Sequence, residues 1–216
     1  MTKKAFTLAE VLITLGIIGV VAAMTLPSVI NDSKRKETSA RLKKFYSTMS
    51  QAIIMSENEN GPAGDWSKDT ANREEDGTLI DMPDSSLKFF QKYIAPYMNI
   101  TEIGKKDYEG TSKAFAAFAD GSIAYFTNGN CLDIIFDSNG TRKPNQEGRD
   151  RFRFLLCTSE FNEEYIGHNK YFGTYIQDLT IEKGREYTKG MCKKNGYYCA
   201  TLLLLDDWEF KEDYPY

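Results

Sequence analysis

The stretch from Phe6 to Ile30 constrains this chain most, because it holds one charged residue, Glu10, in twenty-five positions. As a helix it would be about 37 Å long at 1.5 Å rise per residue. That length crosses a hydrocarbon core of roughly 30 Å with some tilt. We therefore expect a helix over residues 6–30 that can span a membrane.

Glu10 is out of place in a segment that only has to lie in lipid, since a carboxylate inside a membrane helix is costly and is usually set against a partner. The nearest candidate is an amine one helical turn upstream, which would exist if the chain began at Phe6. That requires removal of residues 1–5, a short leader that carries Lys3 and Lys4.

This N-terminus resembles that of type IV pilins and of the pseudopilins of type II secretion. The shared features are a basic leader, a small residue, Phe-Thr-Leu-Ala-Glu at positions 6–10 and then an unbroken apolar run. The resemblance implies that prepilin peptidase cuts between Ala5 and Phe6 and methylates the new Phe6 amine. It also implies that Glu10 guides docking into a filament and that Pro27 bends the helix. The family usually has Gly before the cut, where this chain has Ala5.

Two other interpretations share the apolar run. A cleaved secretory signal peptide has a shorter core, seldom holds Glu and ends in a small-x-small site, for which Ala22-Ala23-Met24 is a poor match. A plain signal anchor needs only the apolar run. The leader charge and the position of Glu10 favour the pilin-like interpretation.

The sequence pattern beyond residue 30 predicts two further parts of the chain. We expect an amphipathic continuation of the helix over 31–60, with one apolar stripe, and an end near Ser56–Asn60 before Gly61-Pro62. An extracytoplasmic globular domain would occupy 61–216. The predicted stripe consists of Leu42, Phe45, Met49, Ile53 and Ile54.

The globular part has the pattern of an α+β fold. Residues 61–83 are predicted as a surface loop, and Asp84-Ser85-Ser86 as the cap of a short helix. Residues 113–128 form two predicted strands joined by a tight turn at Asp120-Gly121, with further strands at 131–136 and 151–156. A long N-terminal helix packed on such an antiparallel sheet is the pilin-like αβ-roll. The fold of 158–216 stays open, with one more strand possible over 171–172 and 174–179.

Four cysteines lie in the C-terminal half, and downstream of a membrane span they indicate two disulfides in an oxidising compartment. The turn dipeptide Asn195-Gly196 suggests that Cys192 pairs with Cys199, leaving Cys131 with Cys157. A zinc site is the alternative, but no spacing is C-x-x-C and His168 is the single histidine.

The orientation signals conflict. The basic run from Lys34 to Lys44 outnumbers Lys3 and Lys4, so the positive-inside rule would keep the C-terminal domain in the cytoplasm. The cysteines and the resemblance indicate the opposite. We expect a single-pass protein of the inner (cytoplasmic) membrane with its C-terminal domain outside the cytoplasm, later part of an extracytoplasmic filament.

The loop from Asp137 to Asp150 is a candidate calcium site. Asp137, Asn139, Asn145 and Asp150 offer hard oxygen ligands, and the resemblance adds that major pseudopilins hold calcium in a loop of the β-region. The spacing is not that of an EF-hand, and Asp and Asn are also ordinary turn residues. A turn without metal is therefore the favoured alternative.

The sequence shows no catalytic motif and predicts a structural subunit rather than an enzyme. The expected partners are prepilin peptidase, other pilin or pseudopilin subunits, an inner-membrane assembly platform and membrane lipid. A net charge of −4 argues against nucleic acid as the main ligand. The alternative is a minor or tip-located pilin-like protein that presents a binding domain for adhesion, DNA or substrate capture. The sequence leaves open whether the filament is a pilus or a secretion pseudopilus.

Overall fold

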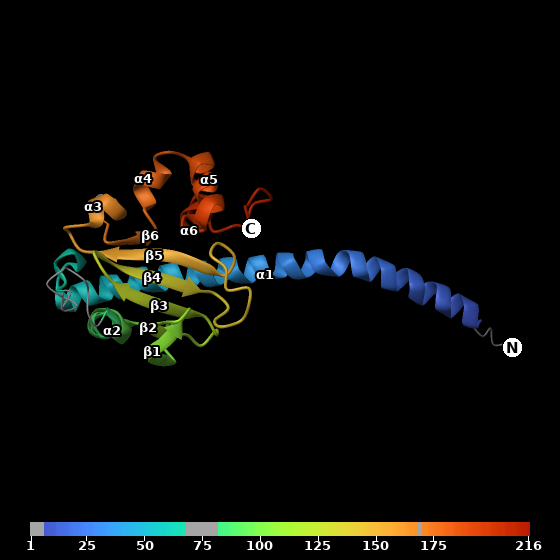
Figure 1. Cartoon of the computed structure of the whole chain (residues 1–216), viewed down its shortest axis with the longest axis horizontal. Helices are drawn as coiled ribbons and strands as arrows, with labels where there is room; N and C mark the ends of the chain where they lie inside the picture. Colours follow the sequence, from blue (N-terminus) through green and yellow to red (C-terminus); the bar gives the residue numbers. More distant parts are fainter. Residues whose placement is uncertain (1–6, 68–81, 168–169) are drawn as a thin grey trace. The chain divides into compact units, whose positions relative to one another are not determined.

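The computed structural model describes residues 7–67, 82–167 and 170–216. It consists of two compact units, Met1–Glu37 and Thr38–Tyr216. Helix α1 (Leu8–Asn60) begins in the first unit and ends in the second (Figure 1). The predicted cleavage between Ala5 and Phe6 lies outside the described residues, as do His168 and most of the predicted loop 61–83.

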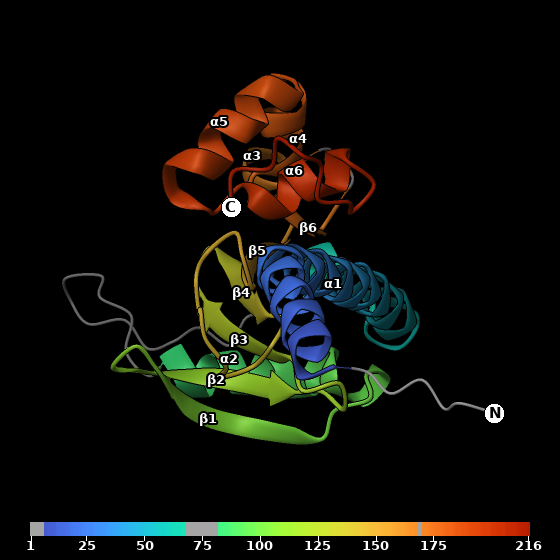
Figure 2. The same cartoon turned by 90° about the vertical axis from the view of Figure 1, so that its right-hand side faces the viewer.

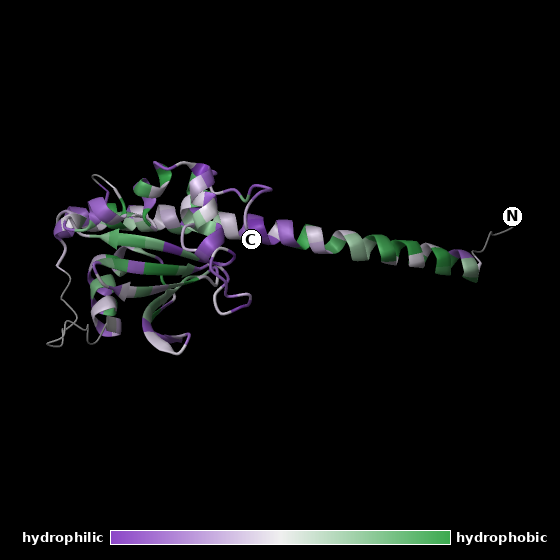
Figure 3. Cartoon of the chain, turned by 45° about the horizontal axis from the view of Figure 1, so that its top comes forward, coloured by the Kyte–Doolittle hydropathy of each residue, from purple (hydrophilic) through white to green (hydrophobic). Residues whose placement is uncertain are grey.

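The first unit is an exposed apolar helix. Its large side chains face outward along its whole length, and Leu12 and Ile18 are both more than 60 % exposed. Figure 3 shows the N-terminal stretch of α1 as mostly hydrophobic. Among the described residues, α1 is the one helix that is long and apolar enough to cross a membrane.

Helix α1 continues through Pro27 without interruption. Proline lacks the N–H that would bond the carbonyl of Ala23, so a bend or local melting is expected there. Local melting is wrong for this helix, because the residues on both sides of Pro27 stay helical.

The second unit is built on one antiparallel sheet in which every strand pairs with its neighbours in the chain, in the order β1-β2-β3-β4-β5-β6 (Figure 2). The four predicted strands are confirmed, β1 is added to them, and the short β6 lies within the further strand that was possible at 171–172 and 174–179. The strands are β1 (Glu102–Tyr108), β2 (Thr111–Ala117), β3 (Ile123–Asn128), β4 (Cys131–Asp137), β5 (Arg151–Cys157) and β6 (Phe172–Thr174).

The main core lies on one face of this sheet. Leu42, Phe45, Met49 and Ile53 of α1 are buried as predicted, and Phe45 stacks on Phe136 of β4 at 4.2 Å between ring centroids. Ile54 was expected in the same stripe, which is wrong, because it points away from the core and is 60 % exposed. The helix ends at Asn60, within the predicted range.

Helix α2 (Met82–Tyr93) packs on the same core, with Phe90 stacked on Phe126 of β3. The predicted cap at Asp84-Ser85-Ser86 is wrong, because α2 already begins at Met82. Ser86 instead accepts a hydrogen bond from the backbone N–H of Asn128, and Ser85 accepts one from its side-chain amide. The two serines therefore fasten α2 to the end of β3.

Two short 3-10 helices flank α2, η1 (Ala63–Asp65) and η2 (Ala95–Tyr97). The start of the predicted surface loop is part of the core, since Ala63 and Trp66 are buried. Trp66 stacks on Tyr93 of α2 at 4.7 Å between ring centroids.

The opposite face of the sheet has a smaller core of its own. It is held together by Arg151 of β5, which bonds Asp137 of β4 and Glu109 of the β1–β2 turn, and whose guanidinium lies over the Tyr108 ring. The buried apolar residues of this face are Tyr108, Phe115, Ile123, Tyr125 and Ile135.

The C-terminal part is mostly helical. The possible strand at 174–179 is wrong beyond its first residue, because Ile176 has a positive φ of 47° and starts a helix. Gly196 ends α5 with a φ of 78°, so the predicted Asn195-Gly196 turn joins two helices. The helices here are α3 (Asn162–Tyr165), α4 (Gln177–Ile181), α5 (Arg185–Asn195) and α6 (Cys199–Leu205).

Candidate functional site

The start of α1 is closed by a reciprocal pair of hydrogen bonds between Thr7 and Glu10. The Thr7 backbone N–H donates to Glu10 Oε2 at 2.8 Å, and the Glu10 N–H donates to Thr7 Oγ1 at 3.3 Å. The Thr7 hydroxyl also donates to the same carboxylate oxygen at 2.7 Å. This is a capping box, which satisfies N–H groups that the first helical turn leaves open. The Thr-x-x-Glu spacing signals it in the sequence, and our sequence analysis missed it.

The apolar part of α1 carries small residues at which another helix could approach closely. A Cβ added at Gly16 or Gly19 would meet no atom within 4 Å. Around Pro27 a shallow groove is lined by Ala23, Leu26, Pro27, Ile30, Asn31 and Lys34. Small residues let helix backbones approach closely in lipid, so this surface suits helix association.

Both disulfides in the structure join the residues expected from the sequence. Cys131 and Cys157 face each other as register partners on β4 and β5. Cys192 and Cys199 link α5 to α6 across the Gly196 turn. All four are buried, and the described residues contain no free cysteine.

The loop from Asp137 to Asp150 is organised around the Asp150 carboxylate. Its Oδ2 accepts hydrogen bonds from the Asn145 backbone N–H at 2.7 Å and from the Asn139 side-chain amide at 3.0 Å. Its Oδ1 accepts one from the Gln146 N–H at 2.6 Å. The loop therefore turns on its own hydrogen bonds, which is the alternative that needs no metal.

Both carboxylate oxygens of Asp137 also accept hydrogen bonds within the protein. Its Oδ2 accepts from Arg151 Nε at 3.1 Å, and its Oδ1 accepts from the Asn139 N–H at 3.3 Å. Burial raises the pKa of Asp137 to about 6, although the hydrogen bond from Arg151 acts in the opposite direction.

The four residues proposed as calcium ligands thus gather in one loop, and calcium binding there stays a prediction. N–H groups or a guanidinium point at both carboxylates, and a cation would have to displace these donors. The amide oxygens of Asn139 and Asn145 are buried without a partner, so the loop does leave acceptor capacity unused. No group of three or more His, Cys, Asp or Glu able to hold a metal is found among the described residues.

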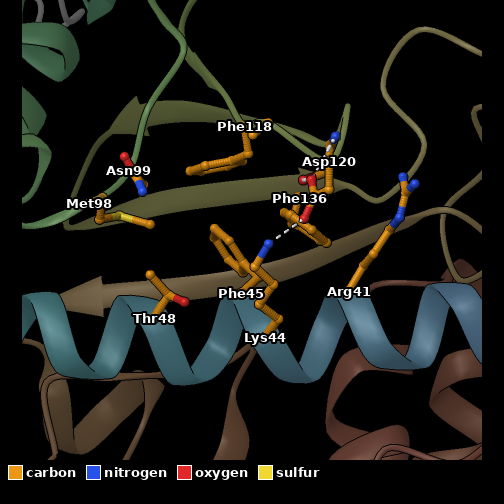
Figure 4. A pocket seen from close by; sticks show the side chains of 11 residues that line it. Arg41, Lys44, Phe45, Thr48, Met98, Asn99, Phe118, Asp120 and Phe136 are labelled. Carbon is orange, nitrogen blue, oxygen red and sulfur yellow. Dashed lines mark hydrogen bonds and ion pairs between the residues drawn. The ribbon is translucent and has the colours of Figure 1, made fainter.

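A pocket of about 190 Å³ opens between α1 and the sheet within the second unit (Figure 4). Its wall is formed by three rings and a thioether, Phe45, Phe118, Phe136 and Met98. We call it the Phe45 pocket. No sequence signal could have found it, because its residues come from four separate parts of the chain, 41–48, 98–99, 118–122 and Phe136.

Two cations and one carboxylate stand at the Phe45 pocket. Lys44 Nζ pairs with Asp120 Oδ2 at 3.0 Å, and Arg41 donates to the carbonyl of Ser138. Partial burial acts to raise the pKa of Asp120, but hydrogen bonds from Ser122 and Lys44 outweigh it and hold the pKa below its usual value. Asp120 is therefore a permanent anion at neutral pH.

The C-terminal tail is fastened at three points. Arg185 of α5 bonds Asp206 at 2.7 Å and Asp213 at 2.8 Å. Tyr214 donates to the carbonyl of Gly148 in the 137–150 loop at 2.6 Å, and Tyr216 donates to that of Cys192. Hydrogen bonds from Arg185 and Lys189 hold the pKa of Asp213 well below its usual range.

Comparison with known proteins gives two family matches. Residues 1–26 match the model of the prokaryotic N-terminal methylation motif, which marks the substrates of prepilin peptidase among type IV pilins and pseudopilins. Residues 28–216 match the model described as a family of unknown function (DUF6613). Searches of characterised proteins and of solved structures return no match. Because the second match covers most of the chain, the protein belongs to the DUF6613 family, and it carries a prepilin-type methylation motif at its N-terminus.

Proposed function

We propose that this protein is a structural subunit of a type IV pilus or a type II secretion pseudopilus. The observation that carries the proposal is the methylation motif followed directly by the first part of α1, whose large apolar side chains from Leu8 to Ile30 are exposed. An apolar helix of this kind is stable only in lipid or against other helices. In the proposed function it does both in turn, first as a membrane anchor and then in the filament core.

The second unit would lie outside the cytoplasm. Its two buried disulfides support this, since disulfides persist in oxidising compartments. The basic residues after the apolar segment oppose it under the positive-inside rule. Non-reducing peptide mapping of protein extracted from cell membranes should find Cys131 linked to Cys157, whereas four free thiols would contradict this orientation.

A second candidate function is favoured by the Phe45 pocket. A minor or tip-located subunit would use the same anchor and filament to present a binding domain. A cavity lined by aromatic rings with charged groups at its mouth is a feature of ligand-binding sites. The abundance of the protein in sheared surface filaments separates a major subunit from a minor one.

Processing by prepilin peptidase is tested by mass. In a host with active prepilin peptidase, the membrane-extracted protein should begin at a methylated Phe6. An intact Met1 terminus in that host would contradict the proposal.

Assembly is tested at Glu10, where charge and capping can be separated. Glu10→Gln keeps a hydrogen-bond acceptor for Thr7 but removes the charge that would attract a neighbouring Phe6 amine. Thr7→Ala removes the cap and keeps the charge, so it is the matched control. We expect Glu10→Gln to insert normally and to be strongly depleted from filaments, with Thr7→Ala much less affected. Normal filaments from Glu10→Gln would exclude an electrostatic docking role.

A further inference from the structure

We propose that the Phe45 pocket binds a small aromatic carboxylate, with its ring among Phe45, Phe118 and Phe136 and its carboxylate beside Lys44. This inference concerns the second unit alone and does not depend on filament assembly.

The wall of the pocket suits a single aromatic ring. Phe45 stacks on Phe136 at 4.2 Å and meets Phe118 edge-on at 5.9 Å between ring centroids. A further ring gains most from offset or edge-to-face contacts with such a set, and the Met98 thioether adds a polarisable contact.

The size of the pocket limits the ligand. About 190 Å³ is less than the roughly 300–1,000 Å³ of pockets for drug-sized molecules. Apolar protein cavities of about 150 Å³ take up a benzene ring. The pocket therefore has room for one ring with a short acidic substituent.

The charges select an anion and place its head group. Arg41 and Lys44 are three residues apart and so lie on one side of α1. Figure 4 shows both rising from the helix on the side that carries Phe45, with Lys44 turned toward Asp120 and the Arg41 guanidinium, which donates to the Ser138 carbonyl, turned away from Phe45. Because Lys44 is next to Phe45 in α1 and its ammonium pairs with Asp120 at the mouth, the ligand we expect carries its carboxylate one or two carbon atoms from the ring, as in phenylacetate. Guanidinium and ammonium groups are strong donors to carboxylates.

Asp120 gives the proposal its sharpest test, since it already occupies Lys44 from across the mouth. An incoming carboxylate would compete with Asp120 for Lys44 and be repelled by it. Asp120→Asn can still accept from the Ser122 backbone N–H and hydroxyl, which bond Asp120 Oδ1. That substitution should therefore improve the binding of an anion and leave the binding of a neutral analogue unchanged.

The experiment is a calorimetric titration of the full chain in lipid nanodiscs with phenylacetate, with empty nanodiscs as the blank and 2-phenylethanol as the neutral analogue. We expect a Kd on the order of 0.1–1 mM for phenylacetate, as a ligand of this size allows. Asp120→Asn should tighten binding about threefold and Lys44→Gln weaken it by a similar factor. Lys43→Gln, an exposed neighbour outside the pocket, should change nothing.

Thr48→Phe fills the pocket from α1 and should abolish binding in a protein with an unchanged unfolding midpoint. Binding that survives this substitution places the ligand elsewhere and overturns the proposal. So do equal affinities for phenylacetate and 2-phenylethanol, or an Asp120→Asn variant that binds no better. If a short peptide ending in Phe with a free carboxylate binds ten times tighter than phenylacetate, the occupant is a polypeptide terminus and the small-molecule assignment is wrong.

Discussion

At the scale of single residues, Asp137 is a carboxyl group that changes its charge close to neutral pH. Its folded-state pKa of about 6 lies above the ordinary value of 3.8, since burial disfavours the carboxylate. Its contribution to stability is therefore complete below about pH 4 and is lost as the pH rises through 6.

We predict that Asp137 makes the protein about 1 kcal/mol less stable at pH 7 than at pH 5. Asp137→Asn should remove this part of the pH dependence, measured as urea unfolding at both pH values. Glu164→Gln, an exposed carboxylate on α3, is the control and should leave the dependence unchanged. If the unfolding free energy of Asp137→Asn changes between pH 5 and pH 7 by as much as that of the parent protein, Arg151 keeps Asp137 ionised at both pH values.

At the scale of elements, the 137–150 loop is held by hydrogen bonds to the Asp150 carboxylate. We predict that millimolar calcium and excess chelator give the same thermal midpoint, because a ligand bound only by the folded state would have to raise it. A rise of several degrees with calcium would mean that the unpartnered amide oxygens of Asn139 and Asn145 are ligands after all.

The C-terminal tail is a second element whose attachment can be tested. Arg185 joins α5 to Asp206 and Asp213, so Arg185→Gln should release the tail while leaving the sheet intact. We expect carboxypeptidase to remove the last residues several-fold faster from this variant. Lys193→Gln, also on α5 and exposed, should be trimmed at the parental rate. If carboxypeptidase trims all three proteins at equal rates, Tyr214 and Tyr216 hold the tail in place and Arg185 does not.

At the scale of the whole molecule, the core of the second unit depends on the end of α1. A fragment of residues 38–216 retains Leu42, Phe45, Met49 and Ile53, and we predict that it unfolds cooperatively in aqueous solution. A fragment of residues 61–216 leaves the covered face of the sheet bare and should aggregate or remain unfolded. Circular dichroism during thermal unfolding distinguishes them, and cooperative unfolding of the shorter fragment would refute the role given to α1.

The sequence predicted the parts of this fold that depend on local chemistry. Strands β2 to β5 were predicted because their apolar runs are bounded by turn residues such as Asp120-Gly121. Strand β1 was missed because Glu-Ile-Gly-Lys-Lys-Asp-Tyr has two apolar residues and acquires its pairing from β2. The apolar run at 201–205 belongs to helix α6, which lies between the Cys199 disulfide and the core. Periodicity cannot distinguish a helix from a strand in so short a run.

The candidate sites divide in the same way. The leader, Glu10 and the cysteine spacing are local signals, and each was available from the residues alone. The Phe45 pocket and the Arg185 cluster join residues that lie far apart in the chain, so they exist only once the sheet and α1 have packed. The capping box of Thr7 and Glu10 is the exception. It is a local signal, carried by the Thr-x-x-Glu spacing, but Glu10 was interpreted through assembly alone.

The strand order of the sheet has a consequence for how the chain reaches its fold. Each strand pairs with the segment just before it and just after it, so loop closure between successive strands is short and entropically cheap. A polypeptide that emerges from a pore one residue at a time can add its strands in order, because each new strand pairs with the strand that emerged just before it. The exception is the apolar stripe of α1, which is made before the sheet it covers and stays exposed until β5 is in place. That interval is when this chain most needs a chaperone or a lipid surface.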